Sequence, residues 1–370
     1  MKYISVDLFS GAGGMSEGLR MAKFCTKYAF EIDPIASLTY KLNHKRTKVF
    51  TQDIRTVKTE TIVKALKGQT IHLLAGCPPC QGFSSIRRLN RNRPVEDERN
   101  FLIREYVRFV EDLHPYTIML ENVPGLEMSS DFHLAVNRLQ DIGYNLAYRV
   151  VNVRDYGVPQ SRKRLVLVGS CLGEINVADG TNERTTVRST IGDLPSPENS
   201  NDLIHKIYPH HIPRIQMLIN HIPHDGGSLR DIGEEWQLAC HQADNVGFND
   251  VYGRLRWDTY STTITGGCLN PSKGRFLHPV QDRCITAREA SMLQTFPIDY
   301  KFPLDAAKTK IALMIGNALP PKFCKIQAEN IRHHLDKYLK TDIMHSFFNV
   351  FLIFLYASQV LVELFLSKAL

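Results

Sequence analysis

No compositional extreme marks this chain, and that lack excludes several classes of protein. Eight cysteines in 370 residues are too dilute for a disulfide scaffold. The chain has no internal repeat and no low-complexity run, so a repeat architecture is not indicated. The 43% hydrophobic and 22% charged residues are ordinary for a soluble globular enzyme, and the length suits one large domain or two modest ones.

The chain also lacks a signal peptide and a strong charge of either sign. Nothing from Met1 to Ile4 resembles a secretory leader, so we expect a cytoplasmic protein in a reducing environment. The formal net charge is +7 and the pI is about 8.9. This mild excess of base is compatible with a nucleic-acid partner but does not require one.

A single Cys-x-x-Cys pair is present, formed by Cys77 and Cys80. A zinc site of this type needs a second pair of ligands at similar spacing, and the chain offers none, so no metal site is predicted. The same spacing also occurs in thioredoxin-like redox centres, and from the pair alone this alternative stays open.

Short apolar runs alternate with helical patterns through the first 170 or so residues. This β-turn-α alternation predicts an α/β protein with a parallel, doubly wound, Rossmann-like sheet. Strands are expected at 3–9, 27–32, 48–51, 70–76, 116–120, 144–152 and 164–170, and helices at 15–21, 34–42, 59–66, 100–113 and 132–142.

The regular alternation stops after Cys171, and the following segment is rich in Gly, Pro, Asn, His and Thr. This change predicts a smaller domain inserted into the first, before helical patterns return at 288–294 and 321–340. The expected divisions are 1–183 and 279–340 for the sheet domain, 184–278 for the insertion, and 341–370 for an apolar tail.

The turn after the first expected strand is rich in glycine but is not Gly-x-Gly-x-x-Gly, so a pyrophosphate ligand is not implied. Glu31 follows about twenty residues later at a strand end, where a carboxylate can hold ribose hydroxyls. Asp53 ends the third strand and is placed to meet an adenine amino group. Together these residues predict an adenosine site without phosphates, which fits S-adenosylmethionine better than NAD.

A cysteine also stands at the exit of the fourth expected strand. Cys80 follows two prolines and precedes Gln81 and Gly82. Because substrates bind at the strand ends of such sheets and thiolates are nucleophiles, this position favours a chemical role over packing.

These motifs, in this order, resemble those of the DNA (cytosine-5)-methyltransferases, most closely the bacterial restriction-modification type. The likeness spans residues 1 to about 340, and its ordered set of motifs removes the thioredoxin-like alternative. The matching segments are Asp7-Leu-Phe-Ser-Gly-Ala-Gly-Gly14, Glu31-Ile-Asp33, Asp53-Ile54, Gly76-Cys-Pro-Pro-Cys-Gln-Gly-Phe-Ser84, Asp97-Glu-Arg-Asn-Phe-Leu102, Glu121-Asn-Val123, Gln160-Ser-Arg-Lys-Arg164, Arg288-Glu-Ala-Ser-Met-Leu-Gln-Thr-Phe-Pro297 and Gly316-Asn-Ala-Leu-Pro-Pro321.

The resemblance implies transfer of a methyl group from S-adenosylmethionine to C5 of a cytosine flipped out of a specific duplex DNA sequence, through a covalent adduct of Cys80 with C6. It further implies protection of host DNA from a cognate restriction endonuclease, without a stable complex, by a monomer. The implied catalytic residues are Cys80, Glu121, Asn122, Arg162 and Arg164; the implied cofactor residues are Phe9, Gly11, Gly13, Glu31, Ile32, Asp53, Ile54, Leu102 and Asn317; the implied DNA contacts are Ser84, Arg87, Arg88, Arg254 and Arg256, and the inserted domain is the expected target-recognition domain.

Two other functions stay open. A eukaryotic tRNA cytosine methyltransferase shares the motif set, although its relatives carry a Cys-Phe-Thr signature that is absent here. A catalytically dead homologue that only binds DNA is disfavoured by the intact Cys80, Glu121 and 160–164 motifs.

The one long apolar run lies outside the resemblance, from Phe347 to Leu366, and Glu363 is its only charge. It is long enough to span a bilayer, but polar residues such as Asn349 and Gln359 would be costly there. We therefore expect a packed or accidental C-terminal extension, with a membrane span as the alternative.

Overall fold

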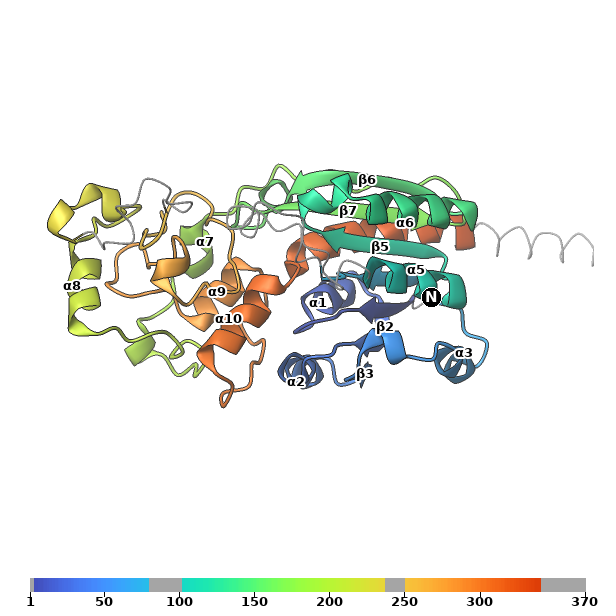
Figure 1. Cartoon of the computed structure of the whole chain (residues 1–370), viewed down its shortest axis with the longest axis horizontal. Coiled ribbons are helices and arrows are strands. Elements are labelled where there is room, and N and C mark those ends of the chain that lie inside the picture. The colour runs from blue at the N-terminus through green and yellow to red at the C-terminus, as the bar shows by residue number, and fades with distance from the viewer. Residues whose placement is uncertain (1–2, 80–101, 237–249, 341–370) are drawn as a thin grey trace, which may run out of the picture.

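A seven-stranded sheet forms the larger of two lobes in the computed structural model, which describes residues 3–79, 102–236 and 250–340 (Figure 1). The strand order is β3-β2-β1-β4-β5-β7-β6. Successive strands are added on one side of β1 up to β3 and on its other side from β4 onward, so the order switches between β1 and β4. The α/β, doubly wound prediction is therefore confirmed. The strands are β1 (Ile4–Leu8), β2 (Cys25–Phe30), β3 (Lys48–Phe50), β4 (Leu73–Gly76), β5 (Thr117–Asn122), β6 (Asn145–Asn152) and β7 (Lys163–Ser170).

The expectation of an all-parallel sheet is wrong for one strand. β7 runs antiparallel to both of its neighbours, β5 and β6. The connection from β6 to β7 contains only the short turn η4 (Val153–Tyr156) and no crossover helix. Two strands joined in this way pair antiparallel, because a parallel pair needs a crossover of a dozen or more residues.

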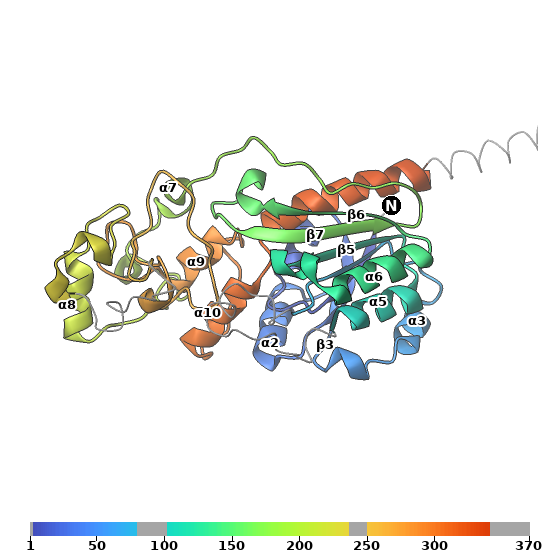
Figure 2. The same cartoon turned by 45° about the horizontal axis from the view of Figure 1, so that its top comes forward.

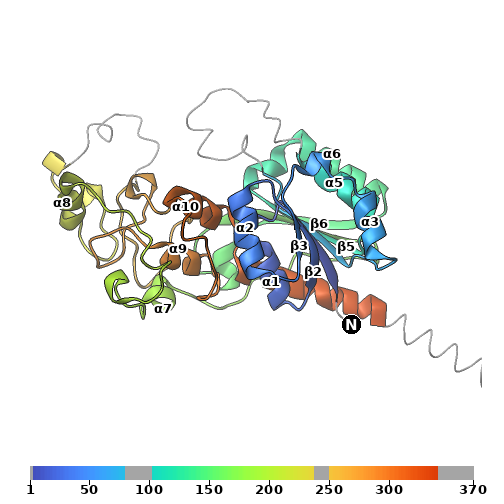
Figure 3. The same cartoon turned by 90° about the horizontal axis from the view of Figure 1, so that it is seen from below.

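Helices cover both faces of the sheet (Figure 3). Successive residues of a strand point to opposite faces, so Leu74 packs under one helical layer while Leu73 and Ala75 pack under the other. Such burial on both sides explains the continuous apolar runs in the sequence. One layer consists of α3 (Glu60–Leu66), α5 (Leu102–Leu113) and α6 (Ser130–Asp141), and the other contains α1 (Gly14–Met21) and a helix over 321–340.

The smaller lobe begins after a long irregular connection that leaves β7 (Figure 2). Its core joins apolar side chains between Val187 and Ile315, and it includes Ala12 and Ala36 of the sheet lobe. This core also holds α9 (Ala287–Leu293) and α10 (Lys308–Asn317), whereas Leu319 and Phe323 pack in a core of the sheet lobe. The domain bounds expected from the sequence stay a prediction. The helices of this lobe are α7 (Val187–Ile191), α8 (Pro213–His221), α9 (Ala287–Leu293) and α10 (Lys308–Asn317), and α2 (Pro34–Asn43) lies beside it (Figure 1).

Arg254 lies inside the smaller lobe, which corrects the expectation that it contacts DNA. The residue has no exposed surface. Its guanidinium donates to the backbone carbonyls of four residues and pairs with Asp282. All its donors are occupied internally, so the side chain organises irregular backbone that lacks helix or strand partners.

Across the described ranges, no helix combines the length and the apolar character needed to cross a bilayer. The apolar tail at 341–370 falls outside those ranges.

Candidate active site

A cavity of about 890 Å³ opens at the carboxyl ends of β1, β2, β4 and β5. This is the edge at which open α/β sheets bind ligands. The cavity contains Glu31 and Glu121, which belong to different strand ends, and the smaller lobe closes it with α10. Of the residues predicted to bind the cofactor or to act in catalysis, the cavity is lined by Phe9, Gly11, Glu31, Ile32, Asp53, Ile54, Leu102, Glu121, Asn122, Arg162, Arg164 and Asn317.

The glycine turn forms one wall and needs left-handed backbone. Gly11 has φ +53°, and a Cβ added to it would meet no atom within 4 Å, so open space lies above this residue. Its N–H donates to Glu31 Oε2 at 2.8 Å, which joins the turn to the end of β2.

Gly13 has a different role from the one predicted, because it does not line the cavity. Its φ is +93°, and a Cβ there would lie 2.7 Å from the Tyr300 hydroxyl and 2.8 Å from Nε2 of His44. The Tyr300 hydroxyl also donates to the carbonyl of Ala12. Gly13 is therefore required for close packing behind the turn, with Tyr300 supplied from the segment after α9.

Glu31 is fixed before any ligand arrives. Its two carboxyl oxygens accept from the N–H groups of Gly11 at 2.8 Å and Asp33 at 2.7 Å. Burial raises the pKa of Glu31, and these two N–H groups counteract the rise. Each oxygen keeps a lone pair with which to accept a further hydrogen bond.

The outer end of the cavity is more open. Ile32 is 63% exposed, whereas Ile54 is buried. Asp53 pairs with Arg55 at 2.6 Å, and that hydrogen-bonded guanidinium lowers the pKa of the Asp53 carboxyl. An exposed apolar side chain beside a carboxylate suits a flat, partly polar ring.

Sequence analysis assigned only Asn317 of α10 to this site, but the structure adds three more residues of that helix. Lys310, Leu313 and Met314 also line the cavity. Their spacing of three and four from one another and from Asn317 places them on one face of the helix. Lys310 Nζ pairs with Asp33 at 3.1 Å, which links α10 to the start of α2.

Glu121 and Arg164 form an ion pair of 2.7 Å at the inner end of the cavity, and both side chains are largely buried. Asn122 donates to the carbonyl of Pro78 at 2.8 Å and so holds the segment that leads to Cys80. The pair presents a carboxylate and a guanidinium to the same space.

Arg162 is buried beside this pair. Nη1 donates to the Ile264 carbonyl at 2.9 Å, while its Nε has no partner within the described residues. Burial and the neighbouring Arg164 lower the pKa of Arg162 to about 9, so the group stays protonated at neutral pH.

Of the Cys-x-x-Cys pair, Cys77 lies within the described residues. Cys77 lines the cavity, and burial together with the Glu121 carboxylate raises its pKa well above the ordinary value, so its thiol is not a nucleophile at neutral pH. Cys80, Ser84, Arg87 and Arg88 lie outside the described residues. Arg256, the remaining predicted DNA contact, is exposed on the smaller lobe.

An α/β sheet with a glycine turn that is not Gly-x-Gly-x-x-Gly and a carboxylate after β2 places the protein in the Rossmann-like fold class. Solved structures support this fold: a candidate DNA modification methyltransferase encoded in an E. coli prophage matches with a TM-score of 0.70 at 24% identity, covering 90% of this chain and 100% of that one. The S. pombe Dnmt2 methyltransferase matches with a TM-score of 0.58 at 20% identity, covering 91% and 99%.

Residues 3–333 match the family described as C-5 cytosine-specific DNA methylase, and the chain belongs to this family. The type II methylase M.HgiDII of Herpetosiphon aurantiacus is 32% identical over 90% of this chain and 95% of its own length. The type II methyltransferase M1.HphI of Haemophilus parahaemolyticus is 30% identical over 90% and 87%. The predicted family is confirmed: the protein is a DNA (cytosine-5)-methyltransferase, and its family and fold imply S-adenosylmethionine as the methyl donor.

Proposed function

We propose that the protein methylates C5 of a cytosine flipped out of a specific duplex DNA site, through a covalent adduct between Cys80 and C6. The observation that carries this proposal is the shared cavity: the glycine turn and Glu31 stand at one end, and the Glu121–Arg164 pair stands at the other. The methyl donor and the cytosine would therefore occupy adjacent parts of one cavity, and C5 of the cytosine would face the methyl group.

The residues of the cavity fit S-adenosylmethionine. A volume of about 890 Å³ lies within the usual range for ligand pockets of this size class, and open space lies above Gly11. Glu31 would accept from the ribose hydroxyls, Ile32 and Ile54 would flank the adenine, and Asn317 and Leu102 would complete the walls. When bound, S-adenosylmethionine supplies an electrophilic methyl group.

Formation of the adduct and activation of the base rest on the protein's own side chains. Addition of the Cys80 thiolate to C6 forms an S–C6 bond and makes C5 electron-rich. Glu121 would share a proton with N3 and accept a hydrogen bond from the N4 amino group, which offsets the negative charge that the addition places on the ring, while Arg164 keeps the carboxyl group in position. After methylation, the C5 proton passes to water, and the electron pair of the C5–H bond re-forms the C5–C6 double bond and expels the Cys80 thiolate from C6.

The smaller lobe would recognise the DNA sequence, in agreement with its few regular elements and exposed loops. Two of the predicted DNA contacts, Arg254 and Arg256, lie within the described residues. We expect Arg256 to contact DNA, because it is exposed whereas Arg254 is buried. Ser84, Arg87 and Arg88 would meet the DNA from the segment after Cys80. We expect Arg256→Ala to weaken binding to all sequences alike and to reduce its salt dependence, if the contact is to phosphate.

The biological role proposed is modification within a bacterial restriction-modification system, in which methylation protects host DNA from an endonuclease of the same specificity. The type II relatives support this role. The protein would act as a monomer and without a stable complex with the endonuclease, because a methylase and a nuclease need only share a target sequence.

The test is Cys80→Ser, assayed with radiolabelled methyl donor on duplex DNA and on tRNA. We expect no methyl transfer to DNA, unchanged binding of S-adenosylmethionine and no product on tRNA with either protein. Cys77→Ser is the matched control, and it should retain activity since that thiol is not ionised. Full activity of Cys80→Ser, or loss of activity only in Cys77→Ser, would refute the assignment.

A further inference from the structure

The chain segment that carries the two cavity arginines is paired with a segment of the smaller lobe. Ser261 N–H donates to the Pro159 carbonyl, and Ser161 N–H donates to the Ser261 carbonyl, both at 2.9 Å. Gln160 and Ser261 thus form a parallel bridge that continues directly toward Arg162. Two residues more than a hundred positions apart are held in one register.

Ile264 continues this pairing through its backbone. Its N–H donates to Gln160 Oε1 at 2.8 Å, and its carbonyl accepts from Arg162 Nη1 at 2.9 Å. The Ile264 side chain lies fully buried in the core of the smaller lobe. Gln160 and Arg162 of the sheet lobe therefore hydrogen-bond the backbone N–H and carbonyl of Ile264, while the Ile264 side chain packs in the smaller lobe.

Gln294 extends the contact to the helices of the smaller lobe. Its Oε1 accepts from Gln160 Nε2 at 2.8 Å, and its own Nε2 donates to the Ile315 carbonyl at 2.7 Å. Gln294 ends α9, and Ile315 lies in the last turn of α10, the helix that closes the cavity. One amide pair thus connects the arginine segment to the cavity wall.

The hydrogen bonds between these segments are buried. Gln160, Gln294 and Ile264 have no exposed surface, so water cannot replace a broken hydrogen bond. A slip by one residue would leave the buried side-chain amides of Gln160 and Gln294 and the backbone groups of Ile264 without these partners, so the hydrogen bonds favour one register between the two segments. The position of Arg162, and with it Arg164 beside Glu121, is set by where 261–264 lies.

We propose that Gln160 and Gln294 are positioning residues that couple DNA recognition by the smaller lobe to the placement of Arg162 and Arg164 at the reacting base. This inference rests on the proposed function. When the smaller lobe seats on its target sequence, segment 261–264 aligns the arginine segment; on a wrong sequence the alignment is imperfect and turnover falls. The pair thus contributes to sequence discrimination although neither side chain reaches DNA.

The experiment compares Gln160→Leu, Gln294→Leu, the double variant and wild type in steady-state methylation of a target site and of a site with one altered base pair. We expect each single variant to lower kcat on the target on the order of a hundredfold, because small misplacements of catalytic groups have that effect. The KM for S-adenosylmethionine should stay unchanged, and discrimination between the sites should fall. The double variant should resemble the single ones, since both break the same contact.

Gln327→Leu is the control, since Gln327 is also fully buried but bonds Ala178 within the sheet lobe. It should keep wild-type kcat and discrimination. Hydrogen exchange of the peptide over 261–265 gives a readout independent of activity, and it should quicken in the Gln160 and Gln294 variants alone.

Faster exchange with unchanged kcat and discrimination would make the pair merely structural and overturn the proposal. Unaltered exchange, or a loss of kcat equal to that of Gln327→Leu, would overturn it as well. A wild-type protein that methylates no duplex DNA would instead refute the proposed function, on which this inference depends.

Discussion

Two buried arginine–glutamate pairs, one in each lobe, have the same length but different surroundings. Glu121 and Arg164 in the sheet lobe are 2.7 Å apart, as are Glu289 and Arg283 in the smaller lobe. The first pair lines a cavity, where its remaining lone pairs and N–H groups can meet a ligand. In the second pair Glu289 is 1% exposed and bonds only protein groups, while Arg283 also borders a separate hollow of the smaller lobe.

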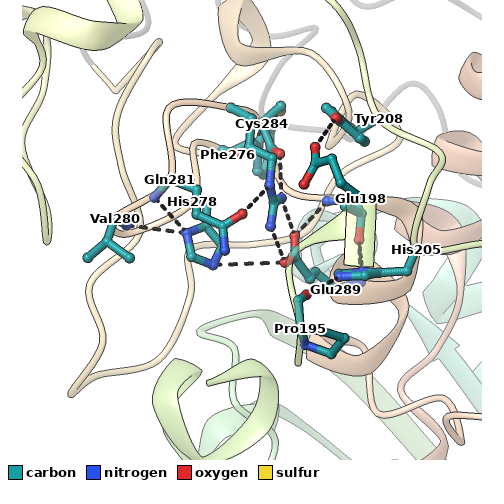
Figure 4. A network of polar contacts seen from close by, with 12 residues as sticks. Pro195, Glu198, His205, Tyr208, Phe276, His278, Val280, Gln281, Cys284 and Glu289 are labelled. Carbon is teal, nitrogen blue, oxygen red and sulfur yellow. Dashed lines mark hydrogen bonds and ion pairs between the residues drawn. The ribbon is translucent and has the colours of Figure 1, made fainter. Parts of the chain in front are cut away.

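The closed pair belongs to a network that Figure 4 displays. Glu289 accepts from the two terminal nitrogens of Arg283, Nη1 and Nη2, and from the N–H of Thr286, and His278 Nε2 lies 3.8 Å from it. Burial by itself raises the pKa of Glu289, but the Arg283 hydrogen bonds and charge outweigh it and hold that pKa below its ordinary value. The Arg283 guanidinium also donates to the Cys284 carbonyl.

The difference shows what buried charge does in a lobe with little regular structure. Helices and strands satisfy their own backbone carbonyls, whereas irregular chain must find other donors. In the smaller lobe arginines supply them: Arg254 bonds four carbonyls, and Arg275 bonds those of Gly226, Gly227 and Arg254. In the sheet lobe, strands pair their own carbonyls, and arginines such as Arg108 and Arg149 bond carbonyls of the irregular chain beside the sheet. The Glu121–Arg164 pair at the strand ends remains available for chemistry.

The largest effect expected from this comparison is on activity. Glu121→Gln should lower kcat on the order of 10²–10⁴-fold, because the neutral amide is a weaker partner for the base and the arginine. The melting temperature should change little, since the cavity admits water around the altered side chain. A stopped assay and a thermal melt of the same preparation measure both. An active but unstable variant would place Glu121 among the structural pairs.

The counterpart, Glu289→Gln, should act on stability. Removal of one charge from a buried pair leaves Arg283 uncompensated, and such changes cost about 3–5 kcal/mol of unfolding free energy. Denaturant titration measures the loss, while kcat per folded molecule should stay near wild type at low temperature. A stable variant with lost activity would break the comparison.

A third acid, Asp7, has no cationic partner in the part of the chain that the structure describes. Asp7 is buried in β1, accepts from the Ser16 hydroxyl at 2.6 Å and leaves Oδ1 without a partner within the described residues. Burial raises its pKa from 3.8 to about 7. Between these values the native state binds more protons than the unfolded state, so the contribution of Asp7 to stability falls as pH rises.

Asp7→Asn should remove this pH dependence. The difference in melting temperature, variant minus wild type, should increase from about pH 5 to about pH 7 and then level off. Comparison with wild type at each pH cancels His44, whose burial lowers its pKa to about 4 and acts with the opposite sign. A difference that stays constant over this range would mean that Asp7 is ionised throughout.

The smallest expected effect concerns the exposed pair between the lobes. Lys310→Met removes the contact with Asp33 and should weaken binding of S-adenosylmethionine by about two- to fivefold, the range for a partly exposed ion pair. Calorimetric titration without DNA measures it, and added salt should reduce the difference. Arg55→Met is the control: it removes the ion pair with Asp53 at the same cavity, and it tests whether loss of any ion pair there weakens binding of S-adenosylmethionine equally.

Much of the fold follows from local pattern in the sequence. The expected strands and helices of the sheet lobe lie within a few residues of those observed, because apolar runs such as 73–76 fit only a strand buried on both faces. The glycine turn and Glu31 are predicted from strand ends and Glu121 from the family resemblance, and all line one cavity. Each of these features depends on residues close together in the chain.

Other features were decided only by the tertiary structure. Arg254 and Arg256 are two positions apart and chemically identical, yet one is buried and the other exposed. The reversed direction of β7, the three added cavity residues of α10 and the Gln160–Gln294 pair all depend on contacts between distant segments. Sequence by itself determined the periods and turns that make the elements. Only folding decided which buried polar groups meet, because a hydrogen-bond partner is chosen by position in space and leaves no local pattern in the chain.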